Sequence, residues 1–292
     1  MTFWQKVIKY LAIAFAIFLI VNIIGVILSI IGVIGGIAFF SNTITDVREE
    51  IIQDQPNYLE SPQVITDNIQ IENITKFEID VKYSTLEIKN DDTFKVESND
   101  KNVTCTQRGN ELIIKETGNN WLNKKEGNTI IIYIPENKEF NEIDFDAGAG
   151  DISIETLTTK DFSFSIGAGK VEINKLNISN EAEIDGGAGK VDILSGEIRN
   201  LDLDMGIGEF NLNTKLLGNN NIEQGMGKLT IRLTDNMQNY TIKTVKGMGS
   251  ITIDGEEAQN NATYGNGQNI VNIEGGMGAI EIVTNTELNQ QI

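Results

Sequence analysis

Residues 165–173 read SIGAGKVEI, and residues 185–193 read DGGAGKVDI. Two such similar strings, twenty residues apart, indicate a structural repeat rather than a single binding loop. Each string holds a glycine–apolar–glycine triplet, and apolar and polar residues alternate after it. This alternation predicts a half-buried β-strand that follows each triplet.

The triplet recurs through the second half of the chain, and its second glycines lie 19, 20, 19, 19, 22 and 29 residues apart. Alternation also precedes the triplets, and none of these repeats holds an apolar run long enough for a helix. The triplets are Gly148–Gly150, Gly167–Gly169, Gly187–Gly189, Gly206–Gly208, Gly225–Gly227, Gly247–Gly249 and Gly276–Gly278.

One strand pair per repeat cannot bury its apolar face alone. Stacked coils can, because each coil pairs with its neighbours at a spacing of about 4.8 Å. We therefore predict an all-β fold, a single-chain β-solenoid with about 19–20 residues per coil. A sandwich built of hairpins is the alternative, but it does not require glycines at constant spacing. In a solenoid the apolar residues after the glycines should form one buried column: Val171, Val191, Phe210 and Leu229.

The glycines are expected to shape a corner that each coil turns at the same place. The residue between the two glycines stays apolar and becomes larger along the chain, as if an inner corner widened. We expect these side chains to be buried in one ladder: Ala149, Ala168, Ala188, Ile207, Met226, Met248 and Met277.

The composition excludes several classes of function. The 292 residues include no histidine, which removes the commonest general base and a common metal ligand. Cys105 is the one cysteine, so neither an intrachain disulfide nor a zinc pattern is possible. The formal charge of −19 disfavours nucleic acid as a partner. We predict that the protein is not an enzyme, and we assign no catalytic, cofactor-binding or metal-binding residue.

An uncharged apolar stretch covers residues 10–40. As a helix it would rise about 45 Å, enough to cross a bilayer of about 30 Å with tilt or bending. Lys6 and Lys9 precede it, which favours a short cytoplasmic N-terminus at residues 1–9. All 42 acidic residues and 21 of the 23 basic ones follow residue 40. We predict a single-pass cell-membrane protein of a bacterium whose repeat domain is extracytoplasmic.

The remaining boundaries follow from composition. Residues 41–70 are acidic and mixed, and we interpret them as a linker. Residues 71–292 are the predicted solenoid, although coils before residue 142 are fainter. Residues 255–269 look like an insertion loop on the penultimate coil. The polar tail from residue 285 should blunt the last open sheet edge.

No motif carries a specific chemistry. The string GAGK resembles a phosphate loop only superficially, because the spacing is wrong and a strand follows it. A calcium-binding β-roll would repeat every nine residues. Cys105 is expected to be a buried strand residue, and Trp121 either caps a local core or makes a contact. A set of outward acidic residues has two interpretations: a stacked row that binds cations weakly, or a solvent-exposed face with no ligand. The residues are Asp144, Asp146, Glu183, Asp185, Asp202, Asp204 and Glu223.

Residues 130–157, IIIYIPENKEFNEIDFDAGAGDISIETL, and the following SIGAGKVEINKL resemble the bacterial β-strand repeat family DUF4097, whose members are often labelled adhesins. The resemblance covers roughly residues 75–285. It implies one N-terminal membrane helix and a place in the envelope of Gram-positive bacteria, in some cases near envelope-stress signalling systems. It implies no catalytic residue. Lys82 and Ser84, in place of the glycines, depart from the pattern.

Three functions remain open from the sequence. The first is an adhesin or cell-envelope scaffold that binds cell-wall polymer or an envelope protein through its surface. The second is an envelope-stress sensor or modulator whose helix contacts a membrane partner through Gly25, Gly32, Gly35 and Gly36. The third, a glycan-active enzyme, requires paired carboxylates in a cleft.

Overall fold

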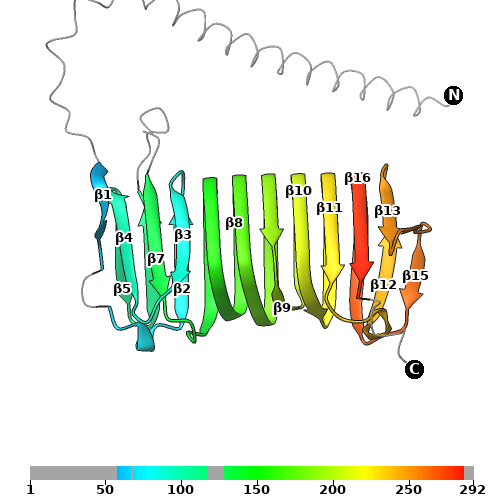
Figure 1. Ribbon diagram of the computed structural model, residues 1–292, viewed down its shortest axis with the longest axis horizontal. Helices are drawn as coiled ribbons and strands as arrows, with labels where there is room; N and C mark the ends of the chain where they lie inside the picture. Colours follow the sequence, from blue (N-terminus) through cyan, green and yellow to red (C-terminus); the bar gives the residue numbers. More distant parts are fainter. Residues whose placement is uncertain (1–57, 67–68, 118–127, 286–292) are drawn as a thin grey trace, which may run out of the picture. The chain divides into compact units, whose positions relative to one another are not determined.

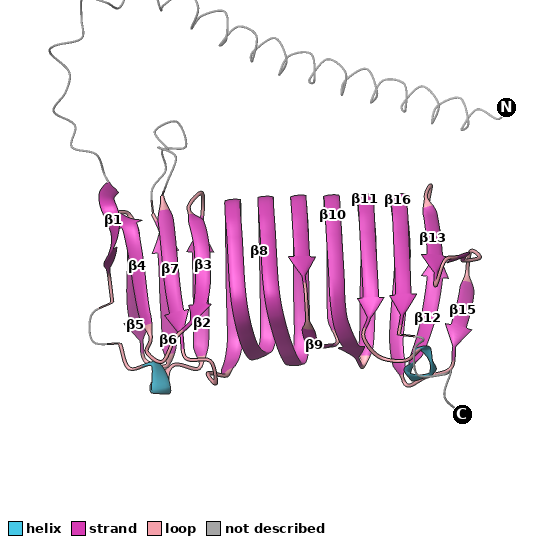
Figure 2. Cartoon of the chain, viewed as in Figure 1, coloured by secondary structure: helices cyan, strands magenta, loops and turns pink. Residues whose placement is uncertain are grey.

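The computed structural model describes residues 58–66, 69–117 and 128–285 (Figure 1). Within these ranges the only helical pieces are two 3-10 turns, η1 (Ile71–Asn73) and η3 (Met237–Asn239), so the all-β prediction is confirmed (Figure 2). The strands join one sixteen-stranded sheet. Their bounds are β1 Tyr58–Val64, β2 Lys76–Val81, β3 Thr85–Asn90, β4 Lys95–Asp100, β5 Val103–Arg108, β6 Glu111–Glu116, β7 Thr129–Ile134, β8 Phe140–Ile193, β9 Gly196–Arg199, β10 Leu201–Leu217, β11 Asn219–Leu233, β12 Tyr240–Val245, β13 Ser250–Ile253, β14 Glu256–Glu257, β15 Ala262–Gly265 and β16 Asn269–Thr284.

Successive coils stack parallel and in register. β10 lies between β8 and β11, and Phe210 pairs with Val191 on one side and with Leu229 on the other. Val171 lies one repeat before Val191 and is equally buried. The predicted column and the solenoid-like architecture are therefore confirmed.

The coils in the middle of the stack also have a third, shorter side. Residues 176–178 of β8 pair with β9, and β9 pairs in turn with residues 215–217 of β10. Side chains alternate inward and outward along all three sides, as the burial pattern of β10 shows. The inward ones form one continuous apolar core from Ile71 to Ile282, which is what a stack of half-buried strands needs to be stable.

Backbone crowding explains the glycines of the corner. A Cβ added to Gly189 would lie 2.0 Å from the carbonyl oxygen of Gly169, and one added to Gly208 would lie 1.9 Å from that of Gly189. Both positions also have positive φ, 150° and 144°, which side chains rarely tolerate. The corner is therefore a close contact between backbones, as predicted.

At the N-terminal end the spatial order of the coils differs from their order in the sequence. The coil of β2 and β3 lies between β8 and the coil of β6 and β7. β5 and β4 then pair antiparallel with β6 and β7, and β1 pairs antiparallel with β4. Among the described residues, β-structure is therefore already present at Tyr58, inside the stretch 41–70 that we predicted as a linker, and not only from residue 71.

The C-terminal end shows the same inversion. β16 is the last of the described strands in the sequence, yet it inserts between β11 and the coil of β12 and β13. The stretch 255–269 is not a plain loop on the penultimate coil. It contains β14 and β15, which pair antiparallel with β13 and β12 and cover the outermost parallel coil. These antiparallel strands therefore cover edges of the parallel stack that would otherwise be open.

Several predictions concern other parts of the chain. The predicted span 10–40, Trp121 and the tail residues 286–292 lie outside the described ranges. Where the chain is described, no helix is both long enough and apolar enough to cross a membrane.

Candidate binding surface

The side chains between the corner glycines form a ladder, but the ladder is exposed. Met226 pairs with Ile207 and with Met277, and Ile207 pairs with Ala188. Ile207 is 60% exposed, Met226 42% and Met277 41%. The prediction of a ladder is confirmed, whereas the prediction that it is buried is wrong. We call these residues the corner ladder; in spatial order they are Ala149, Ala168, Ala188, Ile207, Met226, Met277 and Met248.

The reason lies in the phase of the alternation. Ile166 points inward before the corner and Val171 points inward after it, an odd step of five residues. Strict alternation cannot connect two inward positions across an odd step. One phase shift must therefore occur at the corner, and it turns Ala168 outward. The spacing was visible in the sequence and could have revealed the exposed ladder.

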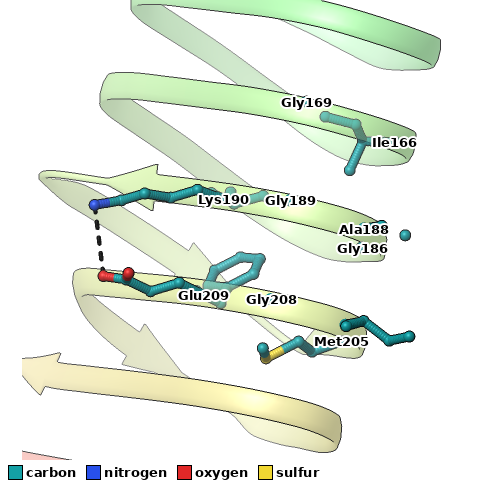
Figure 3. A pocket seen from close by; sticks show the side chains of 13 residues that line it. Ile166, Gly169, Gly186, Ala188, Gly189, Lys190, Met205, Gly208 and Glu209 are labelled. Atoms are coloured by element: carbon teal, nitrogen blue, oxygen red, sulfur yellow. Dashed lines mark ion pairs between the residues drawn. The ribbon is translucent and has the colours of Figure 1, made fainter. Parts of the chain in front are cut away.

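Gly186 opens a hollow beside the corner ladder. It pairs with Met205 and lies in the inward column that also contains Ile166, so a side chain is missing from the column at this point (Figure 3). Unlike a Cβ on Gly189, one added to Gly186 would come no closer than 3.6 Å to any atom. The backbone therefore does not require glycine here. The hollow holds about 260 Å³ of empty space, part of it open solvent.

The surface on one side of the corner ladder carries uncompensated negative charge. Its outward carboxylates stack in register, as in Asp204 between Asp185 and Glu223. Across the described ranges, no ion pair involves any of them. We call this set the acidic flank: Asp144, Asp146, Glu183, Asp185, Asp202, Asp204, Glu223 and Glu274.

On the other side of the corner ladder the charges are paired. Lys170 contacts Glu172 at 3.1 Å, and Lys228 contacts Glu281 at 3.7 Å. Lys190 bridges Asp192 at 3.4 Å and Glu209 at 3.5 Å, the latter drawn in Figure 3. The Asp192 carboxylate raises the pKa of Lys190, with Glu209 adding to the effect. The corner ladder therefore separates a negative flank from a nearly neutral one.

Like-charge crowding is detectable at the start of the acidic flank. Partial burial, and then the neighbouring carboxylates of Asp146 and Glu142, raise the pKa of Asp144. Even so, within the described part of the chain no three acidic or cysteine side chains are grouped so that they could hold a metal ion. The acids form a line along the surface rather than a cage.

The other candidate residue, Cys105, lies on β5 and packs half-buried against the core. Burial raises the pKa of its thiol to about 12. A thiol held in its protonated form is a poor nucleophile. This is consistent with the expected packing role, although the side chain is less buried than predicted.

The family model described as Toastrack DUF4097 matches residues 63–272. Because the match covers well over half of the chain, the chain belongs to this family, and the resemblance noted in the sequence is confirmed. None of the curated proteins matches the chain.

The solved structures similar to the chain include two bacterial proteins. A "putative cell adhesion protein" from Clostridium sporogenes is 21% identical, with a TM-score of 0.36, over 77% of this chain and 100% of that one. A "putative adhesin" from Bacteroides fragilis is 12% identical, with a TM-score of 0.35, over 76% of this chain and 98% of that one. Similarity at this level does not transfer a function.

Proposed function

We propose that this chain is a non-catalytic protein of the bacterial cell envelope that works by surface binding, as an adhesin or a scaffold. In this proposal residues 10–40 anchor it in the membrane, residues 1–9 stay in the cytoplasm, and the solenoid lies outside. The observation that carries the proposal is the exposed corner ladder, a line of apolar side chains on a rigid stack of coils.

An exposed apolar line is costly to keep without a partner. Soluble proteins rarely leave contiguous apolar patches in water, and larger ones mark interaction sites. Here Met248 is 82% exposed and Ile207 60% exposed, whereas most outward positions along the two flanks of the corner carry polar or charged residues. Because successive coils fix the positions of these side chains, a partner would meet a preorganised surface. This supports a function in binding along the ladder rather than a reaction at a single active site.

The anchoring part of the proposal is supported by the sequence. The stretch 10–40 is uncharged, the lysines lie before it, and the part after it carries an excess of 21 negative charges. Such a domain is repelled by anionic lipid. It would be held away from the membrane surface, where it could reach cell-wall polymer or another envelope protein.

The test compares cells that express the full chain with cells that express I207S/M226S. Attachment to surfaces and cell-wall integrity should fall to the level of cells without the gene. A matched control, V64S/L194S, removes two exposed apolar residues that lie off the ladder and should behave as the unchanged chain does. Normal attachment and wall growth in cells without the gene would remove the support for adhesion and scaffolding alike.

A regulatory role is the alternative, and the glycines of the predicted span favour it. Gly25, Gly32, Gly35 and Gly36 would allow close helix–helix contact with a membrane partner. Replacement of residues 10–40 with an unrelated membrane anchor distinguishes the two functions. Adhesion should survive the exchange, whereas signalling through the span should not.

A further inference from the structure

We propose that the corner ladder and its acidic flank form a docking surface for a basic amphipathic helix of a partner protein. The inference rests on the proposed function and deepens it by naming the class of partner. Three features carry it: the spacing of the ladder, the charge beside it, and the hollow at Gly186.

The spacing of the ladder fits a helix better than a strand. Neighbouring ladder side chains lie one coil apart, about 4.8 Å. An α-helix repeats a face about every 5.4 Å, whereas a strand repeats a face about every 6.8 Å. From Ala168 to Met248 the ladder covers five coil steps, about 24 Å. A helix of about 16 residues would span it.

The side chains of the ladder suit an apolar helix face. Ile207, Met226 and Met277 occupy consecutive coils. Methionine is flexible and polarisable, and surfaces that receive amphipathic helices are often rich in it. The alanines at the other end, Ala168 and Ala188, leave room for larger side chains of the partner.

The hollow at Gly186 provides a place for one of those larger side chains. Its walls include Ile166, Met205 and Ile207, all apolar. Because the backbone does not require glycine at this position, the missing side chain marks space that the fold leaves open. A leucine or phenylalanine of the docked helix would fill it and anchor the complex, as buried side chains do at interface centres.

The charge of the surface selects the partner. Eight carboxylates run beside the ladder, and none of them forms an ion pair with another described residue. A docked helix would therefore have basic residues along that edge. A second copy of the chain would offer either its own acidic flank or the flank whose lysines are already paired with carboxylates, so it would leave these acids without basic partners. The uncharged stretch 10–40 could cover the ladder but would leave the carboxylates unpaired. Anionic lipid would be repelled.

The experiment uses the full chain in nanodiscs of zwitterionic lipid, with empty nanodiscs as background. The probe is a synthetic peptide of about 16 leucine and lysine residues arranged with a helical period. One control peptide has the same composition with period-two alternation, and a second has glutamate in place of lysine. We expect the helical lysine peptide to bind at least about tenfold more tightly than either control.

Variants locate the site on the surface. I207S/M226S and G186L should each weaken binding of the helical peptide by about tenfold or more. D185N/D204N should weaken it and reduce its dependence on salt. The matched control for charge is E172Q, on the paired flank, and the control for apolar exposure is L194S. Both should bind as the unchanged chain does.

Several outcomes would overturn the inference. The first two are equal binding of the helical and the alternating lysine peptides, and equal binding of the helical peptide to I207S/M226S and to the unchanged chain. The others are stronger competition for the site by lipid vesicles than by unlabelled peptide, and a dimer in sedimentation that the ladder variants dissociate. If peptides fail to bind but ladder variants still lose attachment in cells, only the helix partner is wrong. If peptides bind as expected but ladder variants attach normally, the proposed adhesion is wrong.

Discussion

The carboxylate of Glu116 on β6 holds the backbone of Ser84 at the corner between β2 and β3, where Lys82 and Ser84 stand in place of the two glycines. Its Oε2 atom accepts the Ser84 N–H at 3.2 Å and those of Lys82 and Tyr83 at 2.8 and 3.0 Å, while its Oε1 atom lies 3.1 Å from the Ser84 hydroxyl. At another corner a backbone carbonyl of the neighbouring coil accepts the corner N–H group, as the Gly276 carbonyl accepts the Met248 N–H. At this corner the Glu116 carboxylate therefore accepts the backbone N–H groups in the way that a backbone carbonyl does at the other corner.

Loss of this carboxylate should destabilise the N-terminal end of the stack. E116A would remove the carboxylate that accepts three corner N–H groups, in a site where Glu116 is only 4% exposed. We expect the free energy of unfolding to fall by about 3 kcal/mol. Urea unfolding of the full chain, followed by circular dichroism, measures the change.

The control for Glu116 keeps the shape of the side chain. E116Q retains one carbonyl oxygen, so it should cost about 1 kcal/mol. S84A removes only the hydroxyl contact and should cost less than E116A. Equal stability of E116A and the unchanged chain would show that the corner backbone is satisfied by other means.

The glycines of the coil at residues 186–189 offer a matched pair. G189A places a Cβ 2.0 Å from the carbonyl oxygen of Gly169 and should cost about 3 kcal/mol or more, because backbone must move. G186A places a Cβ 3.6 Å from its nearest neighbour and should leave stability unchanged or slightly raised. Thermal unfolding of the two variants, side by side, provides the measurement. A similar loss for both would contradict the account of the corner.

The repeat spacing was enough to predict the solenoid and the column of Val171, Val191, Phe210 and Leu229. The alternation recurs at the same place in each repeat, so stacked coils bring equivalent apolar residues together. It was not enough for the ends. The insertion of β16 between β11 and β12 depends on which edge is free, and each coil has similar edges. The exposure of Ile207 was missed because apolar character was equated with burial.

The raised pKa of Asp144 predicts a pH-dependent stability. The folded chain opposes ionisation of this carboxyl because of its partial burial and then of Asp146 and Glu142. Its charge therefore destabilises the fold above the raised pKa, and the cost disappears as pH falls to the ordinary value of 3.8. D144N should stabilise the chain at pH 7 by less than about 1 kcal/mol, because solvent screens the site.

The same comparison at about pH 3, where the carboxyl is protonated in both states, should show no benefit of D144N. E172Q is the control, since its carboxylate pairs with Lys170 at 3.1 Å and its loss should not stabilise the chain. Urea unfolding at both pH values measures the differences. An equal gain for D144N at both values would mean that charge is not the cause.

The thiol of Cys105 should react slowly while the chain is folded. Burial raises its pKa from 9.0 to about 12, so at pH 8 the thiolate, the reactive form, is about a thousandfold rarer than in the unfolded chain. Labelling with iodoacetamide, followed by mass spectrometry, should therefore be slow in buffer and fast in urea. C105A, which lacks the only cysteine, should show no labelling in either condition. Fast labelling of the folded chain would show that β5 opens readily, because only opening would expose the half-buried thiol fully to solvent and reagent.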